Sequence, residues 1–225
     1  GTTFNRGAIF MNAIFERFTC FAFATFEGYA DFRETIFKIS TEFKGTTFKG
    51  NSNFEGATFK GHTTYFTNAI FEGDVNFFVV KFKGNAYFKK ATFKEDACFE
   101  EANFDGDADF RLKYFVKILN FSKIKTLPGK KLFVNSNNEE GKISFERAYL
   151  ENIYLDIDLV EGTLIDFTDT LLRNTKIEKD KIENHILQEK DFEFPKAQEI
   201  YLLLKNNFHS IGRYNDESWA FIKEK

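Results

Sequence analysis

Large apolar residues recur along the first half of the chain with a period that fits neither a helix nor an ordinary strand. Phenylalanine returns at alternating steps of five and six residues, so the repeating unit is eleven residues. The first series is Phe4, Phe10, Phe15, Phe21, Phe26, Phe32, Phe37, Phe43, Phe48, Phe54 and Phe59. After one added residue, the second series is Phe66, Phe71, Phe77, Phe82, Phe88, Phe93, Phe99, Phe104, Phe110, Phe115 and Phe121. A helix repeats about every 3.6 residues and a half-buried strand about every two, so neither element explains this spacing.

A small side chain stands two positions before most of these phenylalanines. It is Ala, Thr or Ser before eighteen of the first twenty, and Val75 and Val80 are the exceptions. Glycine often stands two positions after the phenylalanine, which is typical of a corner with a positive φ or a close backbone approach. Strand alternation directs the small residue and the phenylalanine inward and the residue between them outward. Each step is therefore predicted to be one short side of a β-solenoid.

The outward positions favour four sides in each coil. Thr3, Ile14, Thr25, Ile36 and Thr47 precede alternate phenylalanines, so like residues return every 22 positions and would stack above one another. A two-sided coil would instead mix Thr and Ile on one face. The sequence therefore predicts a mainly β fold, a four-sided solenoid with about 22 residues per coil over residues 1–121. Its predicted interior includes Phe15, Phe26, Phe37, Phe48, Phe59, Phe71, Phe82, Phe93 and Phe104.

Several segments repeat the order small residue, polar residue, phenylalanine and two variable residues. Direct instances are Ala91–Glu95, Ala97–Glu101 and Ala102–Gly106. In this pattern residues 2–121 resemble the pentapeptide-repeat family. The resemblance implies a right-handed quadrilateral β-helix with stacked large residues inside and polar side chains outside. The sequence departs from the family in the extra residue at every second step, which lengthens a coil from about 20 to about 22 residues.

The pattern changes after Phe121. Residues 122–142 contain Pro128-Gly129 and a polar run, which predict a loop or irregular insertion. Residues 143–177 carry large apolar residues at a step of five, which predicts further coil in a five-residue register, of about 20 residues per coil. The residues that mark this register are Phe145, Leu150, Leu155, Val160 and Ile165.

Residues 178–225 are predicted to form a mainly helical cap or hairpin. Pro195 suits the first turn of a helix that includes residues 197–210, Gly212 ends it, and residues 216–225 form a second helix. The segment resembles a tetratricopeptide-type hairpin in the spacing of Tyr201, Leu204, Phe208, Gly212, Tyr214 and Phe221. One hairpin cannot bury its own face, so we expect it to pack on the last coil or to continue past Lys225. The resemblance to family members that continue into membrane segments adds one alternative: the chain is the cytoplasmic domain of a larger membrane protein, whose membrane segment follows Lys225.

Charge and composition narrow the classes of function. The chain has a formal net charge of −3, and residues 1–121 carry 15 acidic and 15 basic residues, so direct nucleic-acid binding is not predicted. Some pentapeptide-repeat proteins mimic DNA and occupy type II topoisomerases such as gyrase. Mimicry needs a dominant negative surface, so this function stands as an alternative only. Two cysteines and no apolar run of membrane length predict a cytoplasmic chain without a membrane span.

The sequence contains no motif that points to catalysis, a cofactor or a metal. His62, His185 and His209 lie far apart, and carboxylates on a convex rod lack the desolvated site that acid–base catalysis needs. Cys20 and Cys98 are separated by an odd number of half-coils, so they are predicted to be free thiols on opposite sides.

We therefore predict a non-enzymatic, rigid protein-interaction or regulatory module with an unidentified protein partner and no cofactor. The candidate partner surface combines an apolar pair with part of an acidic run, although such runs are more often solvated faces. Its residues are Phe78, Val79, Glu95, Asp96, Glu100 and Glu101.

Overall fold

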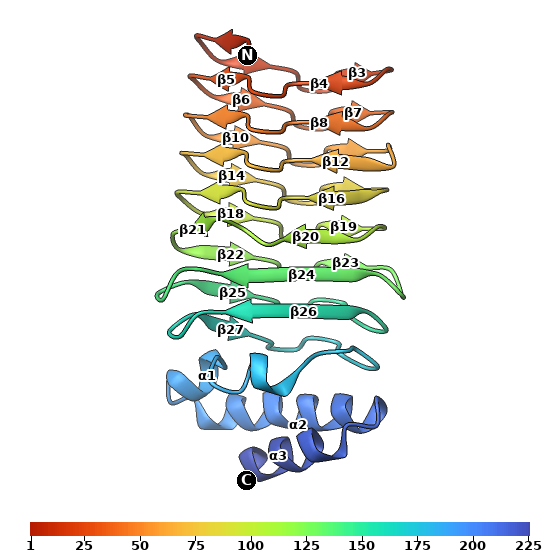
Figure 1. The fold of residues 1–225 in the computed structure, drawn as a ribbon, viewed down its shortest axis with the longest axis vertical. Coiled ribbons are helices and arrows are strands. Elements are labelled where there is room, and N and C mark those ends of the chain that lie inside the picture. The colour runs from red at the N-terminus through yellow and green to blue at the C-terminus, as the bar shows by residue number, and fades with distance from the viewer.

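The computed structural model describes residues 1–225 and shows a four-sided β-solenoid of about seven turns, closed at its C-terminal end by helices (Figure 1). Each of the early coils contributes one short strand to each of four parallel sheets that run along the rod. Successive coils are in register: Thr25 pairs with Thr3 on one side and with Thr47 on the other, 22 residues away each time. The predicted mainly β solenoid with a small helical hairpin is confirmed.

The strands fall into four sheets, called sheets 1 to 4 in the order in which the chain meets them. Sheet 1 contains β1 (Thr3–Phe4), β5 (Thr25–Phe26), β9 (Thr47–Phe48), β13 (Ile70–Phe71), β17 (Thr92–Phe93) and β21 (Tyr114–Phe115). Sheet 2 contains β2 (Ala8–Ile9), β6 (Ala30–Asp31), β10 (Ser52–Asn53), β14 (Val75–Asn76), β18 (Ala97–Cys98), β22 (Ile118–Asn120), β25 (Lys142–Ser144) and β27 (Leu164–Asp166). Sheet 3 contains β3 (Ile14–Phe15), β7 (Ile36–Phe37), β11 (Thr58–Phe59), β15 (Lys81–Phe82), β19 (Asn103–Phe104) and β23 (Lys125–Thr126). Sheet 4 contains β4 (Thr19–Cys20), β8 (Thr41–Glu42), β12 (Thr63–Tyr65), β16 (Asn85–Tyr87), β20 (Ala108–Phe110), β24 (Lys131–Ser136) and β26 (Tyr154–Leu159).

Phenylalanine rings fill the interior of the rod. Phe66 is fully buried and stacks between Phe43 and Phe88, with ring centroids 4.8 and 4.7 Å apart. This spacing follows the rise of the coil, because neighbouring strands lie about 4.8 Å apart. Rings from different sides meet edge to face, as Phe66 and Phe54 do at 5.5 Å and 89°, which the ring quadrupole favours. The lumen is therefore a packed core.

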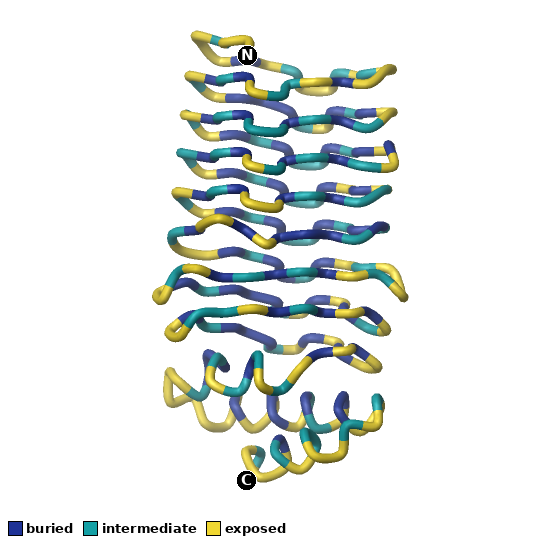
Figure 2. Tube along the Cα trace, in the orientation of Figure 1, coloured by how far each residue is buried: buried dark blue, intermediate teal, exposed yellow.

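The first coil is the exception to this burial. The interior positions Phe26, Phe37, Phe48, Phe59, Phe71, Phe82, Phe93 and Phe104 are buried. Phe15 is only half-buried, although its ring stacks on Phe37 at 5.0 Å. Phe15 belongs to the first coil of the sequence, where Figure 2 shows mostly exposed residues, and its ring stacks on one coil only.

The small residue of each step lies inward beside the ring. Where it is threonine in a five-residue step, the buried hydroxyl donates to the carbonyl of a phenylalanine in the preceding coil, whereas Thr19 and Thr41, in six-residue steps, donate to the carbonyl two residues before them. Thr35 Oγ1 donates to the Phe10 carbonyl at 2.9 Å, and Thr46 Oγ1 donates to the Phe21 carbonyl at 2.8 Å. Ala and Thr both suit this position because Ala has no polar side-chain atom and the Thr hydroxyl is satisfied.

The corners are of two kinds, and each explains some of the recurring glycines. Five-residue steps turn through a residue with a positive φ, such as Gly45 (62°), Gly56 (66°) or Asn68 (57°). Six-residue steps bring the backbones of successive coils together, so a Cβ on Gly84 would lie 2.2 Å from the carbonyl oxygen of His62. Close approach, and not backbone conformation, therefore requires glycine at the second kind of corner.

The structure differs from the expected loop at residues 122–142. This segment contains β23 and the six-residue β24, which continues sheet 4 by pairing with β20 and β26. Leu132 and Val134 point inward and are buried in place of phenylalanine. Pro128-Gly129 makes only a corner, with Gly129 at a φ of 78°. The interior therefore continues with aliphatic residues, which a pattern of phenylalanines does not reveal.

The coil at residues 143–177 also differs from the predicted five-residue register. Ile143 pairs with Ile165, so the coil is 22 residues long and not 20. Phe145, Leu150 and Leu155 are buried, but Val160 comes just after the long strand β26 and is only half-buried. Because β26 has six residues, this side of the coil is longer than five residues allow.

The C-terminal segment folds into short helical turns followed by a hairpin. It contains the 3-10 turn η1 (Lys179–Lys181), α1 (Leu187–Lys190), α2 (Phe194–Ser210) and α3 (Tyr214–Glu224). Helix α2 packs on the last coil, where the Asn207 side chain accepts the Thr175 N–H and donates to the Thr175 carbonyl, both at 2.9 Å. Helix α3 packs on α2 through Trp219, whose ring meets Tyr201 at 5.4 Å. None of the helices combines the length and the apolar character that a membrane-spanning helix needs.

Candidate interaction surface

Charged side chains on the outer faces pair along the rod. Lys49 lies 3.0 Å from Glu27, and Lys94 lies 2.8 Å from Glu72, each pair being one coil apart. Exposed pairs of this kind contribute about 0–1 kcal/mol each, so their main effect is on the surface charge. The 22-residue period therefore creates vertical ladders in which acidic residues already have basic neighbours.

The predicted partner residues lie at the two borders of sheet 2. Glu95 and Asp96 come just before β18, at the corner between sheets 1 and 2. Glu100 and Glu101 follow β18 at the corner between sheets 2 and 3, and Phe78 and Val79 lie there one coil earlier. The structure thus divides the six residues into two groups, with the strands of sheet 2 between them.

Lysines neutralise most of the predicted acidic surface. Lys123 Nζ donates to Glu100 at 2.8 Å and to Glu101 at 3.3 Å, and these bonds raise the pKa of Lys123. Lys117 donates to Glu95 at 2.7 Å, and this bond raises the pKa of Lys117. Asp96 is exposed and forms no ion pair. The acidic run is therefore part of the ladders and not a continuous anionic patch.

Phe78 and Val79 are half-buried rather than fully exposed. Val79 borders a shallow groove of about 440 Å³ at the corner between sheets 2 and 3, called here the corner groove. The groove is lined by Val79, Glu101, Asn103, Lys123, Lys125, Arg147 and Tyr149. Three of these residues follow Lys123, in the part of the chain where the sequence pattern loses its phenylalanines.

Val79 carries backbone strain at this corner. Its φ is 56°, a conformation that a β-branched residue adopts only at a cost. Asparagine occupies the same conformation elsewhere, as at Asn68 (57°). We expect Val79→Asn to raise the free energy of unfolding by about 0.5–1 kcal/mol, measured by chemical denaturation. The control Val116→Asn, at a half-buried site without a positive φ, should give no gain, and an equal gain there would contradict this explanation.

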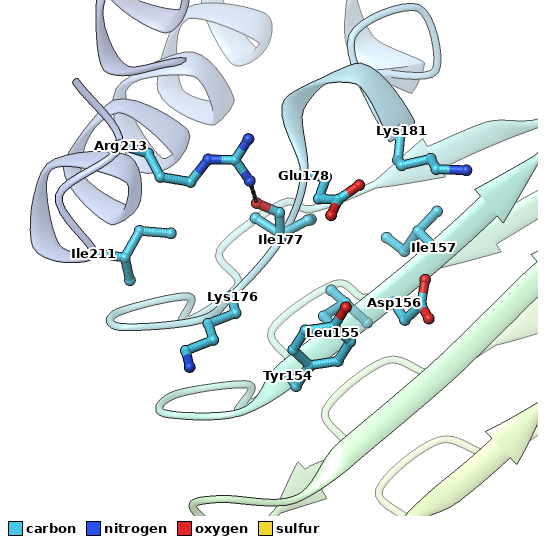
Figure 3. A pocket seen from close by; sticks show the side chains of 10 residues that line it. All are labelled: Tyr154, Leu155, Asp156, Ile157, Lys176, Ile177, Glu178, Lys181, Ile211 and Arg213. Atoms are coloured by element: carbon cyan, nitrogen blue, oxygen red, sulfur yellow. Dashed lines mark hydrogen bonds between the residues drawn. The ribbon is translucent and has the colours of Figure 1, made fainter. Parts of the chain in front are cut away.

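A second hollow, called here the junction cavity, lies where the last coil meets the helical hairpin. Its volume is about 300 Å³. Figure 3 shows its lining side chains, which come from β26, from η1 and the residues just before it, and from the turn between α2 and α3. Its ten residues are Tyr154, Leu155, Asp156, Ile157, Lys176, Ile177, Glu178, Lys181, Ile211 and Arg213. Half of them are apolar and form the floor, and the charged ones form the rim.

Two of the three basic side chains around the junction cavity, Arg213 and Lys181, already have hydrogen-bond or ion-pair partners within the chain. Arg213 donates to the Ile177 carbonyl at 3.0 Å and pairs with Asp216. Lys181 Nζ donates to Asp158 at 2.8 Å, and this bond raises the pKa of Lys181.

The acidic groups on the same rim are free. The carboxylates of Asp156 and Glu178 have no basic partner within 4 Å, although their charges also contribute to the raised pKa of Lys181. The rim therefore presents two unpaired carboxylates and one unpaired lysine, Lys176, above an apolar floor.

The sequence did not reveal this cavity. Its residues fall in three stretches near positions 155, 177 and 212, and only the packing of α2 on the last coil brings them together. The signal that was available is the alternation of Leu155 and Ile157 with Asp156 along β26, which places the carboxylate outward. The predicted five-residue register for residues 143–177 did not include this alternation, because it counted only Leu155 of β26 as an inward position.

The remaining candidate groups lie apart from one another. No group of three or more His, Cys, Asp or Glu side chains is placed to hold a metal ion. Cys20 in β4 and Cys98 in β18 are free thiols on sheets 4 and 2, which are opposite faces of the rod. His62 is exposed at the corner that holds the added residue.

The geometry defines a β-solenoid repeat protein with four parallel sheets and a filled interior. A family model described as pentapeptide repeats (9 copies) matches residues 21–69, 40–80 and 66–111. The matched residues run from the end of the first coil to just past β20, and this part of the chain is similar to the pentapeptide-repeat family, as the sequence pattern predicted. A comparison with curated proteins gives no match.

Proposed function

We propose that the chain is a non-enzymatic, rigid protein-interaction module that anchors a partner protein at the junction cavity. The observation that carries the proposal is the pair of free carboxylates, Asp156 and Glu178, above an apolar floor. Elsewhere the lumen is filled with aromatic and aliphatic side chains, and outer carboxylates such as Glu27 and Glu72 pair with lysines along the rod. Partner anchors concentrate in small pockets with an apolar base and a polar rim.

The chemistry of the cavity favours a long basic side chain as the anchor. The stem of a lysine or arginine would lie against Tyr154, Leu155 and Ile157, and its charged end would reach Asp156 and Glu178. A cavity of about 300 Å³ accommodates one or two side chains, so the rest of the partner would rest on the surrounding surface.

Site-specific crosslinking in the cells that make the protein tests the proposal. Tyr154 is 39% exposed at the cavity, and Tyr114 is 40% exposed on sheet 1, so the two form a matched pair. With a photoreactive phenylalanine at either position, we expect one discrete crosslinked protein from position 154 and none from position 114. Asp156→Lys should reduce that crosslink about tenfold or more, because it places a positive charge against the basic anchor.

A charge reversal outside the cavity is the control. Glu139 is exposed and forms no ion pair, so Glu139→Lys should leave the crosslink unchanged. The proposal fails if both tyrosine positions give the same products, if neither gives any, or if Asp156→Lys and Glu139→Lys behave alike.

DNA mimicry of a type II topoisomerase has weaker support. Carboxylates such as Glu27, Glu72 and Glu95 each lie within 3.0 Å of a lysine, so a phosphate-like array of free negative charge is interrupted on these faces. Unchanged supercoiling by gyrase at saturating protein would remove this alternative. A cytoplasmic location is part of the proposal, and the two free cysteines support it.

A further inference from the structure

Exposed apolar side chains gather on the later coils of sheet 3. Tyr149 is 48% exposed, Leu127 is 46% exposed and Leu171 is 44% exposed. Tyr149 pairs with Lys125 in the coil before it and with Leu171 in the coil after it, so these three outward side chains stand one above another. Leu127 lies beside Lys125, two residues further along the same coil. Apolar side chains that adjoin one another on a surface mark a contact site more often than isolated ones do.

This column joins two shallow hollows. Tyr149 lines the corner groove, and Leu171 lines a hollow of about 360 Å³ where the last coil meets α2, called here the hairpin hollow. Leu203 of α2 lines the hairpin hollow from the other side. The corner groove, the column and the hairpin hollow are together called the sheet 3 strip. From Asn103 to Leu171 the strip spans three coil rises, about 14 Å, and α2 adds about 10 Å.

Basic side chains border the sheet 3 strip. The four basic and two acidic side chains that line its hollows are Lys123, Lys125, Arg147, Arg173, Glu101 and Glu151. Lys125 and Arg173 have no carboxylate within 4 Å, and Lys125 Nζ lies 5.4 Å from the centroid of the Tyr149 ring. The strip thus has a surplus of two positive charges in a chain whose net charge is −3. Charge complementarity favours an acidic partner.

The main chain beneath the strip is already paired between coils. The Tyr149 N–H donates to the Ile124 carbonyl at 2.8 Å, and the Leu171 N–H donates to the Ala148 carbonyl at 2.9 Å. A partner strand finds no open edge here, so side chains must make the contact. Side chains in the column repeat about every 4.8 Å. Helix residues three or four positions apart lie about 4.5 or 6.0 Å apart along the axis, whereas alternate residues of a strand lie about 6.7 Å apart.

We propose that the sheet 3 strip binds an acidic amphipathic helix of a partner protein, with the helix axis parallel to the rod. Apolar side chains at every third or fourth position of that helix would lie on Tyr149, Leu171 and Leu203. Carboxylates beside them would reach Lys125 and Arg173. A strip of about 24 Å holds a helix of about 16 residues. The strip lies on sheet 3, whereas β26 of the junction cavity belongs to sheet 4, so this inference does not depend on the function proposed for that cavity.

Fluorescence anisotropy with a synthetic helix tests the proposal. The probe is a fluorescein-labelled, alanine-based peptide of about 16 residues, with leucine at every third or fourth position and glutamate on both flanks of the leucine stripe. We expect it to bind the full chain with a dissociation constant of about 100 μM or lower. The same peptide with lysine in place of glutamate should bind at least about tenfold more weakly. A version with two central prolines, which cannot form the helix, should weaken to the same degree.

Substitutions in the chain locate the binding surface. Leu171→Glu should raise the dissociation constant of the acidic probe more than about tenfold, because it places a like charge on the apolar column. Its control is Ile118→Glu on sheet 2, where the side chain is 42% exposed. Lys125→Glu should have a similar effect, and its control is Lys113→Glu, at an exposed lysine without an ion pair. Circular dichroism melts verify that all four variants are folded.

Three results would overturn the proposal. The first is no binding of the acidic probe at about 1 mM protein. The second is equal binding of the lysine peptide, which would exclude charge complementarity, or of the proline peptide, which would mean that the strip takes an extended segment. The third is that Leu171→Glu and Lys125→Glu behave like their controls, which would place the contact elsewhere on the chain.

Discussion

Phe66→Ala is expected to lower the free energy of unfolding by about 3–5 kcal/mol. The ring is fully buried and contacts six other rings, namely those of Phe43, Phe54, Phe59, Phe71, Phe77 and Phe88. Hydrogen bonds between coils fix the coil spacing, so the neighbouring rings cannot collapse into the space that the substitution leaves. Guanidinium denaturation followed by far-ultraviolet circular dichroism measures the loss.

An exposed phenylalanine of the same chain provides the comparison. Phe23 is 71% exposed, so Phe23→Ala should change the free energy of unfolding by less than about 0.5 kcal/mol. A loss below about 1 kcal/mol for Phe66→Ala would mean that the lumen can contract around a missing ring, contrary to the packing described above.

The periodic part of the fold could be predicted from the sequence because every side of the solenoid follows the same pattern of residues. A phenylalanine at each side has to point inward, so its spacing fixes the number of sides and the length of a coil. The same rule implies that positions 22 residues apart are vertical neighbours, and the ion pair of Lys94 with Glu72 is one consequence. Even the added residue before Phe66 is absorbed at the corner before β12, because Thr64 pairs with Thr41, 23 positions earlier, and the next coil returns to 22.

The sequence-based prediction of the fold was wrong where aliphatic residues, and not phenylalanine, fill the interior of the solenoid. Leu132, Val134, Ile143 and Leu155 fill the later coils, and aliphatic residues also occur on outer faces, as Leu171 shows. Without phenylalanine the period is no longer visible, so residues 122–142 resembled a loop. The junction cavity could not be predicted from the sequence for a different reason. It forms only when α2 packs on the last coil, and this tertiary contact joins segments that share no repeat.

The column of glycines at the corner between sheets 3 and 4 reflects contact between coils rather than flexibility. A Cβ on Gly84 would lie 2.2 Å from the carbonyl oxygen of His62 and 2.4 Å from that of Gly61, and Gly106 stands in the same relation to Gly84. All of these are backbone atoms, so no change of side-chain rotamer can relieve the overlap. The coils would have to separate, which would break the 2.9 Å hydrogen bond from the Asn85 N–H to the His62 carbonyl.

Gly84→Ala should therefore lower the free energy of unfolding by about 3 kcal/mol, as judged by the shift of the guanidinium midpoint at an unchanged slope. At an unstrained site the same substitution stabilises by about 0.4–1 kcal/mol, because alanine restricts the unfolded chain. Gly7 is such a site, since its added Cβ would have only one neighbour, the Tyr29 carbonyl oxygen at 3.5 Å, and its φ is not positive. Gly7→Ala should be neutral or stabilising. If Gly84→Ala were equally harmless, the coils would be able to move apart at this corner, and the close approach would not be what selects glycine there.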